Sequence, residues 1–213
     1  MPASNPSALS WDIGWTRAWQ KAGFPGLVLL GQYCWRTDQN PHPMMKRIGL
    51  DYTFSYHWPT FAGQEFMPAG SNPPGRQIVE AQERCWRSEA KEALPNVATV
   101  SMGWDSAPWN FFCTRTQWRL TPAEFKSACQ RARSLLEERP AADLAGRMIL
   151  IDNWNEYGEG HYVFPTQQYR FGYLDAIREV FAPNAVAHTD VVPEDIGRGP
   201  YDSALKPRGT SSK

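Results

Sequence analysis

The stretch MILIDNWNEYGEG, at positions 148–160, decides the fold class of this chain. Its first four residues are all apolar, which is typical of a short strand that is buried on both faces. Strands of this kind belong to parallel sheets, because helices cover both faces of such a sheet. Polar, aromatic and glycine residues follow directly. We therefore expect an α/β fold that carries functional side chains where this strand ends.

Three earlier segments repeat this arrangement of a predicted strand, apolar or rich in strand-forming residues, followed by a polar and aromatic end. They lie at positions 26–30, 52–56 and 97–100. Apolar spacing predicts helices at positions 43–48, 77–94, 121–136 and 168–181. The third helix begins with a capping box, Thr121-Pro-Ala-Glu124. The alternation predicts about four β/α units, and right-handed crossovers would place all four strand ends on one face.

Aromatic and polar side chains gather at these predicted strand ends. The chain has 10 Trp and 8 Tyr, and such side chains combine an apolar face with a hydrogen-bonding tip. Core packing is the alternative for any single aromatic residue. Their gathering at one end favours a substrate-binding site, with the candidates Tyr33, Trp35, Tyr56, His57, Trp58, Trp104, Asp105, Trp154, Asn155, Tyr157 and His161.

Two carboxylates, Glu156 and Glu159, follow the last strand. Three residues apart, they lie on one face if the segment makes a helical turn. Close carboxylates drive each other's pKa values apart, so that one holds a proton while the other is ionised. Cleavage of a glycosidic bond requires such an acid and base. The alternative is a solvated acidic turn that caps a helix.

Two histidines, His57 and His161, are the obvious candidates for metal ligands. Neither has a second ligand at the spacing of a metal site, so we expect hydrogen-bonded histidines at the rim of the site and no bound metal. Asp105 follows Trp104 at a strand end, and its role is either functional or structural.

The last motif resembles a known family. NWNEYGEG at 153–160, with Pro165 and then GYLDAI at 172–177, is similar to the Asn-Glu-Trp-x-Glu-Gly block of glycoside hydrolase family 99-like proteins. WbsX-type proteins of polysaccharide biosynthesis clusters share this block. GWDSAP at 103–108 resembles a second family motif, Gly-Trp-Asp-x-x-Pro. The resemblance extends from about position 97 to 181 and continues more weakly over 26–59.

The resemblance implies a TIM barrel that acts on glycans, which are α-mannosides for the characterised hydrolases. By position, Glu156 would assist the 2-hydroxyl of the substrate, and Glu159 would be the general acid and then the base. It implies no cofactor and no metal.

The chain departs from the family pattern at two residues and in length. Tyr157 stands where the family usually has Trp, and Phe164 stands where it usually has Glu. The matching part corresponds to the C-terminal half of the barrel. We therefore expect a partial barrel domain over 1–182 and an irregular tail over 183–213. Open sheet edges predict self-association or pairing with a separate N-terminal half-barrel.

Composition narrows the classes of partner. Lys plus Arg equals Asp plus Glu, at 22 each, so no basic surface suggests nucleic acid or a membrane. The four cysteines form no CxxC pair, and we expect reduced thiols. The sequence contains no recognisable signal peptide and no apolar run of spanning length, so the default expectation is a cytoplasmic chain.

Three functions fit these observations. A glycoside hydrolase that acts on an oligosaccharide or polysaccharide is the first, because of the carboxylate pair. A WbsX-type glycosyltransferase or polysaccharide biosynthesis protein that uses the same site is the second. A truncated, non-catalytic remnant that binds glycans is the third.

Overall fold

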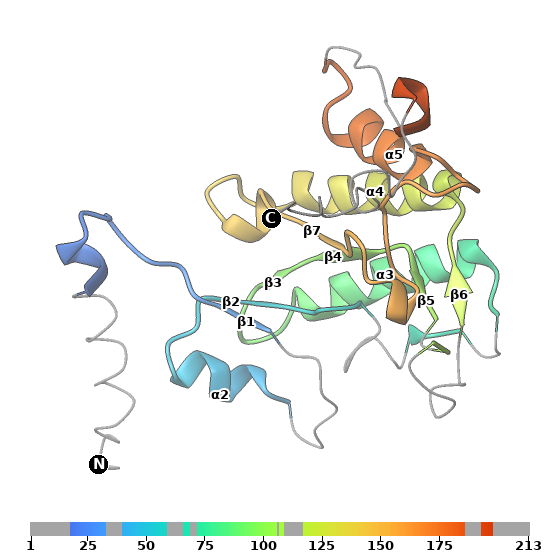
Figure 1. Ribbon diagram of the computed structural model, residues 1–213. Helices are drawn as coiled ribbons and strands as arrows, with labels where there is room; N and C mark the ends of the chain where they lie inside the picture. Colours follow the sequence, from blue (N-terminus) through green and yellow to red (C-terminus); the bar gives the residue numbers. More distant parts are fainter. Residues whose placement is uncertain are drawn as a thin grey trace, which may run out of the picture. The chain divides into compact units, whose positions relative to one another are not determined.

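The computed structural model describes residues 18–32, 40–58, 66–68, 72–105, 107–108, 117–185 and 193–197. The chain divides into two compact units, Met1–Pro183 and Asn184–Lys213. The first unit contains the strands and the longer helices (Figure 1). In the described part of the second unit there is a short 3-10 helix, Pro193–Ile196.

Parallel strands form the centre of the first unit. One sheet has the order β1 (Leu30–Gln32), β2 (Tyr52–Phe54) and β3 (Asn96–Val97), and a second pairs β4 (Thr99–Ser101) with β7 (Leu150–Asp152). Only Ala98 separates β3 from β4, so this continuous stretch lies between β2 and β7. The predicted α/β alternation with parallel strands is confirmed, and neighbours in the chain are neighbours in space.

The helices are α2 (His42–Arg47), α3 (Gly75–Glu89), α4 (Pro122–Glu137) and α5 (Gly172–Phe181). Helix α4 packs against both α3 and α5 (Figure 1). Its start confirms the capping box: the Thr121 hydroxyl accepts a hydrogen bond from the Glu124 amide, and the Glu124 carboxylate accepts one from the Thr121 amide. This reciprocal pair satisfies two amide groups that no helical carbonyl reaches.

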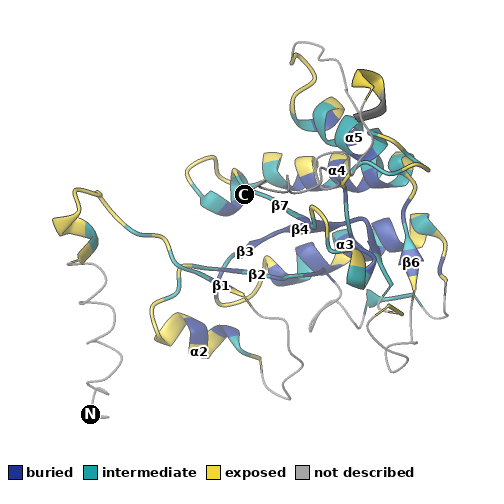
Figure 2. Ribbon diagram, viewed as in Figure 1, coloured by how far each residue is buried: buried dark blue, intermediate teal, exposed yellow. Residues whose placement is uncertain are grey.

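The main hydrophobic core lies between α3, α4, α5 and strand β4, which is buried along its whole length (Figure 2). Ring packing gives it specificity: Phe125 and Tyr173 meet edge to face, with ring centroids 5.5 Å apart. The Tyr173 hydroxyl donates a hydrogen bond to the Leu120 carbonyl, which satisfies the polar tip of a buried ring.

Helix α3 also binds the end of β4 through a side-chain amide. Gln82 is fully buried; its Nε2 donates to the Ser101 carbonyl at 3.0 Å, and its Oε1 accepts from the Ser101 amide at 2.9 Å. The side chain therefore presents to β4 the donor and acceptor that a neighbouring peptide group would present.

Several features differ from the sequence-based expectation. The strand predicted at 26–30 lies at Leu30–Gln32, and the helix predicted at 168–181 begins at Gly172. The helix predicted at 77–94 ends at Glu89, because the chain must turn before it can place Asn96 beside β2. An unpredicted antiparallel pair joins β5 (Gly103–Trp104) to β6 (Trp118–Arg119). Among the described residues, none of the helices has the length and apolar character needed to cross a membrane.

Candidate active site

The site begins where β4 and β7 end side by side. Ser101 and Asp152 are register partners in the parallel ladder, and both are buried. The Ser101 hydroxyl donates a hydrogen bond to Asp152 Oδ2 at 2.7 Å. The sheet therefore fixes an acidic side chain at the carboxyl end of its strands, where ligands bind in folds of this class.

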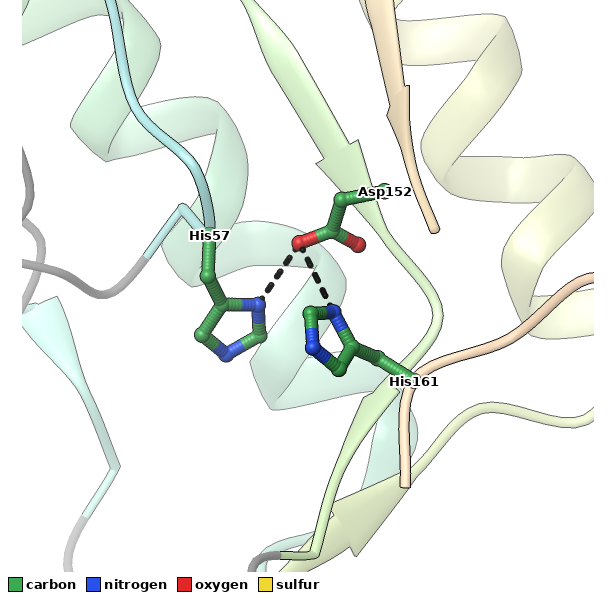
Figure 3. Close-up of side chains that lie close together, drawn as sticks. All are labelled: His57, Asp152 and His161. Carbon is green, nitrogen blue, oxygen red and sulfur yellow. Dashed lines mark hydrogen bonds and ion pairs between the residues drawn. The ribbon is translucent and has the colours of Figure 1, made fainter. Parts of the chain in front are cut away.

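Two histidines converge on the Asp152 carboxylate (Figure 3). His57, from the segment after β2, places Nδ1 2.8 Å from Asp152 Oδ2. His161, from the segment that leaves the 152–160 loop, places Nδ1 3.5 Å from the same oxygen. All three side chains are buried, so the cluster lies beneath the surface rather than at the rim predicted for the histidines.

Tryptophan rings hold His57 in place. Trp104 stacks on its imidazole with centroids 4.6 Å apart and planes 26° apart, and Trp118 stacks at 5.6 Å and 17°. These two rings come from β5 and β6, so the unpredicted strand pair has a direct role in shaping the site. Flat apolar faces against the imidazole exclude water, which strengthens the interaction of His57 with Asp152.

Glu159 lies at the end of a 3-10 turn, Tyr157–Glu159, that Gly160 closes. Gly160 has φ of 66°, a conformation that favours glycine. A Cβ at Gly160 would stand 2.6 Å from the Asp105 Cβ. The Asp105 amide donates to the Glu159 carbonyl at 2.7 Å, so this close approach fixes the backbone of the turn.

The Glu159 carboxylate has two neighbours that orient it. The Tyr56 hydroxyl donates to Glu159 Oε2 at 2.9 Å, and His161 Nε2 lies 2.9 Å from the same oxygen. Burial makes the largest contribution to a raised pKa of Tyr56. The hydrogen bond and charge of Glu159 raise it further, and the charges of Glu156 and Asp152 add to the effect. The Tyr56 hydroxyl is thus affected by all three carboxylates, and it stays protonated as a hydrogen-bond donor.

The charges within the buried cluster follow from its contacts. Burial lowers the pKa of His57 despite the attraction of Asp152. Burial acts in the same direction on His161, but the hydrogen bonds and charges of Asp152 and Glu159 outweigh it and raise the pKa of His161. Burial alone would raise the pKa of Asp152, yet the two histidines lower it. These shifts favour an ionised Asp152 between a neutral His57 and a protonated His161.

Glu156 is half-buried at the start of the turn. Its backbone carbonyl accepts a hydrogen bond from the His161 amide at 3.2 Å. Among the described residues its carboxylate has no hydrogen-bond partner, in contrast to Glu159. The two motif glutamates thus differ in environment.

Exposed aromatic side chains line the outer edge of the same loop. Trp154 is 52% exposed and Tyr157 50% exposed, and Phe164 lies edge to face with both, at centroid distances of 5.4 and 6.1 Å. Asn155 is exposed beside them. Large apolar side chains gathered in water are typical of a binding surface.

The remaining predicted site residues fall into three groups. Tyr33 and Trp35 lie outside the described residues. Trp58 is buried, and its amide donates to the Ser101 hydroxyl at 3.3 Å, so it supports the cluster from behind. The Asp105 carboxylate accepts from the Ala107 amide at 3.0 Å, which is a local structural role.

Three residues of the site were absent from the sequence-based candidates: Ser101, Trp118 and Asp152. Asp152 carried a usable signal, because it is an acid placed directly after the apolar run that ends at Ile151. Ser101 and Trp118 carried none, because their roles depend on strand pairing.

By residue type, His57, Asp152 and His161 could hold a divalent cation, since one ligand atom from each lies within 4.8 Å of the others. The 2.8 Å contact between His57 Nδ1 and Asp152 Oδ2 is itself a hydrogen bond. We interpret the cluster as hydrogen-bonded, and the absence of a metal stays a prediction.

Comparisons with known proteins identify the family. Residues 10–177 match the family described as glycosyltransferase WbsX. The uncharacterized protein WxcX of Xanthomonas campestris pv. campestris, from strain B100 and again from strain ATCC 33913, is 27% identical over 136 residues. Each match covers 55% of this chain and 19% of the relative, so the chain spans about a fifth of the curated relatives' length.

One solved structure shows a similar fold. A glycoside hydrolase-like protein superimposes with a TM-score of 0.56 at 16% identity, over 87% of this chain and 51% of that one. The GH99 endo-alpha-mannosidase from Bacteroides thetaiotaomicron is less similar, with a TM-score of 0.38 at 15% identity, over 73% and 43% of the two chains. The family description connects the chain with glycan-related enzymes. Because the family model matches most of its length, this chain belongs to the glycosyltransferase WbsX family.

Proposed function

We propose that this chain carries the acid–base site of a glycoside hydrolase of the family 99-like type, with Glu156 and Glu159 as its carboxylates. The observation that supports this most directly is the contrast between the two glutamates. Tyr56 and His161 both contact Glu159, whereas the Glu156 carboxylate has no hydrogen-bond partner among the described residues. A pair with different surroundings suits a mechanism in which one carboxyl holds a proton and the other is ionised.

The exposed aromatic side chains beside this pair support a glycan as the substrate. Trp154 and Tyr157 present apolar ring faces and polar tips, which suit the alternating apolar and hydroxyl faces of a pyranose ring. Asn155 adds an amide next to them. We propose these three residues as substrate contacts.

The test is hydrolysis of mannose-containing oligosaccharides, followed by mass spectrometry of the products. Glu159→Gln should reduce turnover about 10²- to 10⁴-fold, because it removes a group that gives and takes protons. Glu156→Gln should also reduce it. Glu80→Gln is the matched control, since Glu80 lies on α3 and, within the described part of the chain, makes only a long 3.8 Å ion pair with Arg76. Unchanged turnover in both motif variants would overturn the proposal.

A glycosyltransferase is the second candidate, and the description of the family favours it. The same carboxylates would then activate an acceptor hydroxyl instead of water. Incubation with an activated sugar donor and an acceptor glycan distinguishes the two functions, because a transferase lengthens the acceptor and a hydrolase shortens it.

We further propose that the chain is one half of a (β/α) barrel. The strand order β1, β2, β3–β4 and β7 follows the chain order, as in a barrel wall, and the fold matches 51% of a larger glycoside hydrolase-like protein. A half-barrel leaves apolar edges that another half would cover. Sedimentation of the purified chain tests this proposal: we expect a self-associated species, and a stable monomer would contradict it.

A further inference from the structure

His161 lies between two carboxylates and is itself inaccessible to a ligand. Its imidazole is 0% exposed. Nε2 lies 2.9 Å from Glu159 Oε2, and Nδ1 lies 3.5 Å from Asp152 Oδ2. The ring therefore joins a carboxylate that is 28% exposed to one that is buried, and a glycan cannot contact it directly.

Contacts from four directions fix the orientation of this ring. The Tyr56 ring meets it edge to face at 5.3 Å, and the Trp104 ring lies 5.2 Å away. The His161 amide donates to the Glu156 carbonyl, which ties its backbone to the catalytic turn. Asp152 in turn is held by Ser101 and His57. A ring held in this way keeps Nε2 directed at Glu159.

We propose that His161 is the positioning residue of Glu159 and stores, at Nε2, the proton that Glu159 uses when it acts as an acid. The proton moves along the 2.9 Å contact: the Nε2–H bond breaks and an O–H bond forms on Glu159 Oε2. The imidazolium becomes a neutral imidazole, and the carboxylate becomes a carboxylic acid. Asp152 stays ionised and retains the interaction with the Nδ1–H group.

The groups around His161 favour its protonated form. The titratable groups that face His161 are Asp152, Glu159, Tyr56 and His57. Two of them are carboxylates, and they raise the pKa of His161 against the effect of burial. The two carboxylates thus favour a protonated imidazole beside Glu159.

The first test needs no enzymatic activity. The chain is labelled with ¹⁵N-histidine, treated with EDTA, and titrated by NMR while the His161 ring nitrogens are followed. Glu159→Gln should shift the His161 titration to lower pH, because it removes one of the two carboxylates that stabilise the imidazolium. Glu156→Gln is the matched control, since only its backbone contacts His161, and it should cause a clearly smaller shift. Equal titrations of wild type and Glu159→Gln would overturn the proposal.

The second test measures the pH profile of turnover and rests on the proposed function. His161→Gln keeps a donor at the position of Nε2 but cannot release a proton. We expect its activity at neutral pH to fall at least tenfold and its profile to move to lower pH, where Glu159 takes protons from solvent. A pH profile of turnover with unchanged shape would contradict the proposal that His161 stores a proton for Glu159. If the chain has no activity on any glycan, the hydrolase proposal fails while the NMR titration still decides the role of His161.

Discussion

The buried cluster and the exposed rim of the site come from one short segment, yet they have opposite characters. Asp152 and His161 are almost fully enclosed, while Trp154 and Tyr157 between them are half exposed. The cluster is polar and joined by hydrogen bonds and ion pairs, whereas the rim is aromatic and faces water. Polar groups therefore fix the geometry of the site from inside, and apolar groups are left available for a ligand.

The buried cluster should be far more sensitive to substitution than the rim. Asp152→Ala should lower the free energy of unfolding by about 3 to 5 kcal/mol, because it leaves buried partners of a charge uncompensated. Urea unfolding at pH 7 measures the loss. Asp152→Asn keeps one acceptor oxygen for His57 and Ser101 and should cost less. A loss below about 1 kcal/mol for the alanine variant would show that the cluster contributes little to stability.

The turn that connects rim and cluster should show an intermediate sensitivity. Gly160→Ala should destabilise the chain by about 1 to 3 kcal/mol, since alanine disfavours the positive φ and its Cβ would collide with Asp105. Gly26→Ala is the control, because a Cβ there meets nothing within 4 Å. Thermal unfolding of the two variants compares them, and equal midpoints would contradict this assignment.

The rim should affect binding and leave stability unchanged. Trp154→Ala should change the free energy of unfolding by less than about 0.5 kcal/mol, because the side chain is largely in water. Its affinity for a glycan should fall about tenfold through loss of a stacking face. Isothermal titration measures the affinity, with the exposed Phe24→Ala as the matched aromatic control. An equal loss of affinity in both variants would show that Trp154 is not a specific glycan contact.

The pH dependence of stability should be the weakest signal, because the two histidines act in opposite directions. Below the ordinary value of 6.5, the lowered pKa of His57 means that the unfolded chain binds more protons, so stability falls with acid. Above 6.5, the raised pKa of His161 means that stability is lost as pH rises through its folded value. Asp152 causes a further loss of stability only below its ordinary pKa of 3.8. Urea unfolding from pH 4 to 9 should show a maximum near 6.5.

Variants that remove one histidine separate these two arms. His57→Gln should flatten the acidic arm, and His161→Gln should flatten the alkaline arm. A wild-type curve that rises steadily through pH 6.5 to 9 would contradict the assigned charges.

Sequence patterns predicted the features that depend on neighbours along the chain. The start of α4 at Thr121 follows from a capping box of four residues, and the structure has both of its hydrogen bonds. The apolar run before Asp152 likewise predicted β7. Local chemistry determines these elements, so one sequence suffices to find them.

The contacts that build the site join distant positions, and a single sequence carries little signal for them. His57 and Asp152 are 95 residues apart, and Tyr56 and Glu159 are 103 apart. The strands β5 and β6 have two residues each, too few to show an alternating pattern. The sequence predicted that Tyr56, His57, Trp104 and Glu159 lie near one another at the strand ends, and in the structure they do. It did not predict how deeply each is buried, because burial depends on packing.

The side-chain amide of Gln82 connects the candidate site to helix α3, which lies outside the 152–160 loop. By pairing with both backbone groups of Ser101, it makes the placement of the Asp152 carboxylate depend on α3, a helix that contributes nothing to the rim. Glutamate at this position would lack the donor, and a shorter side chain would not reach the strand. Substitutions in α3 can therefore change the geometry of the candidate site, although this helix contributes no residue to its rim.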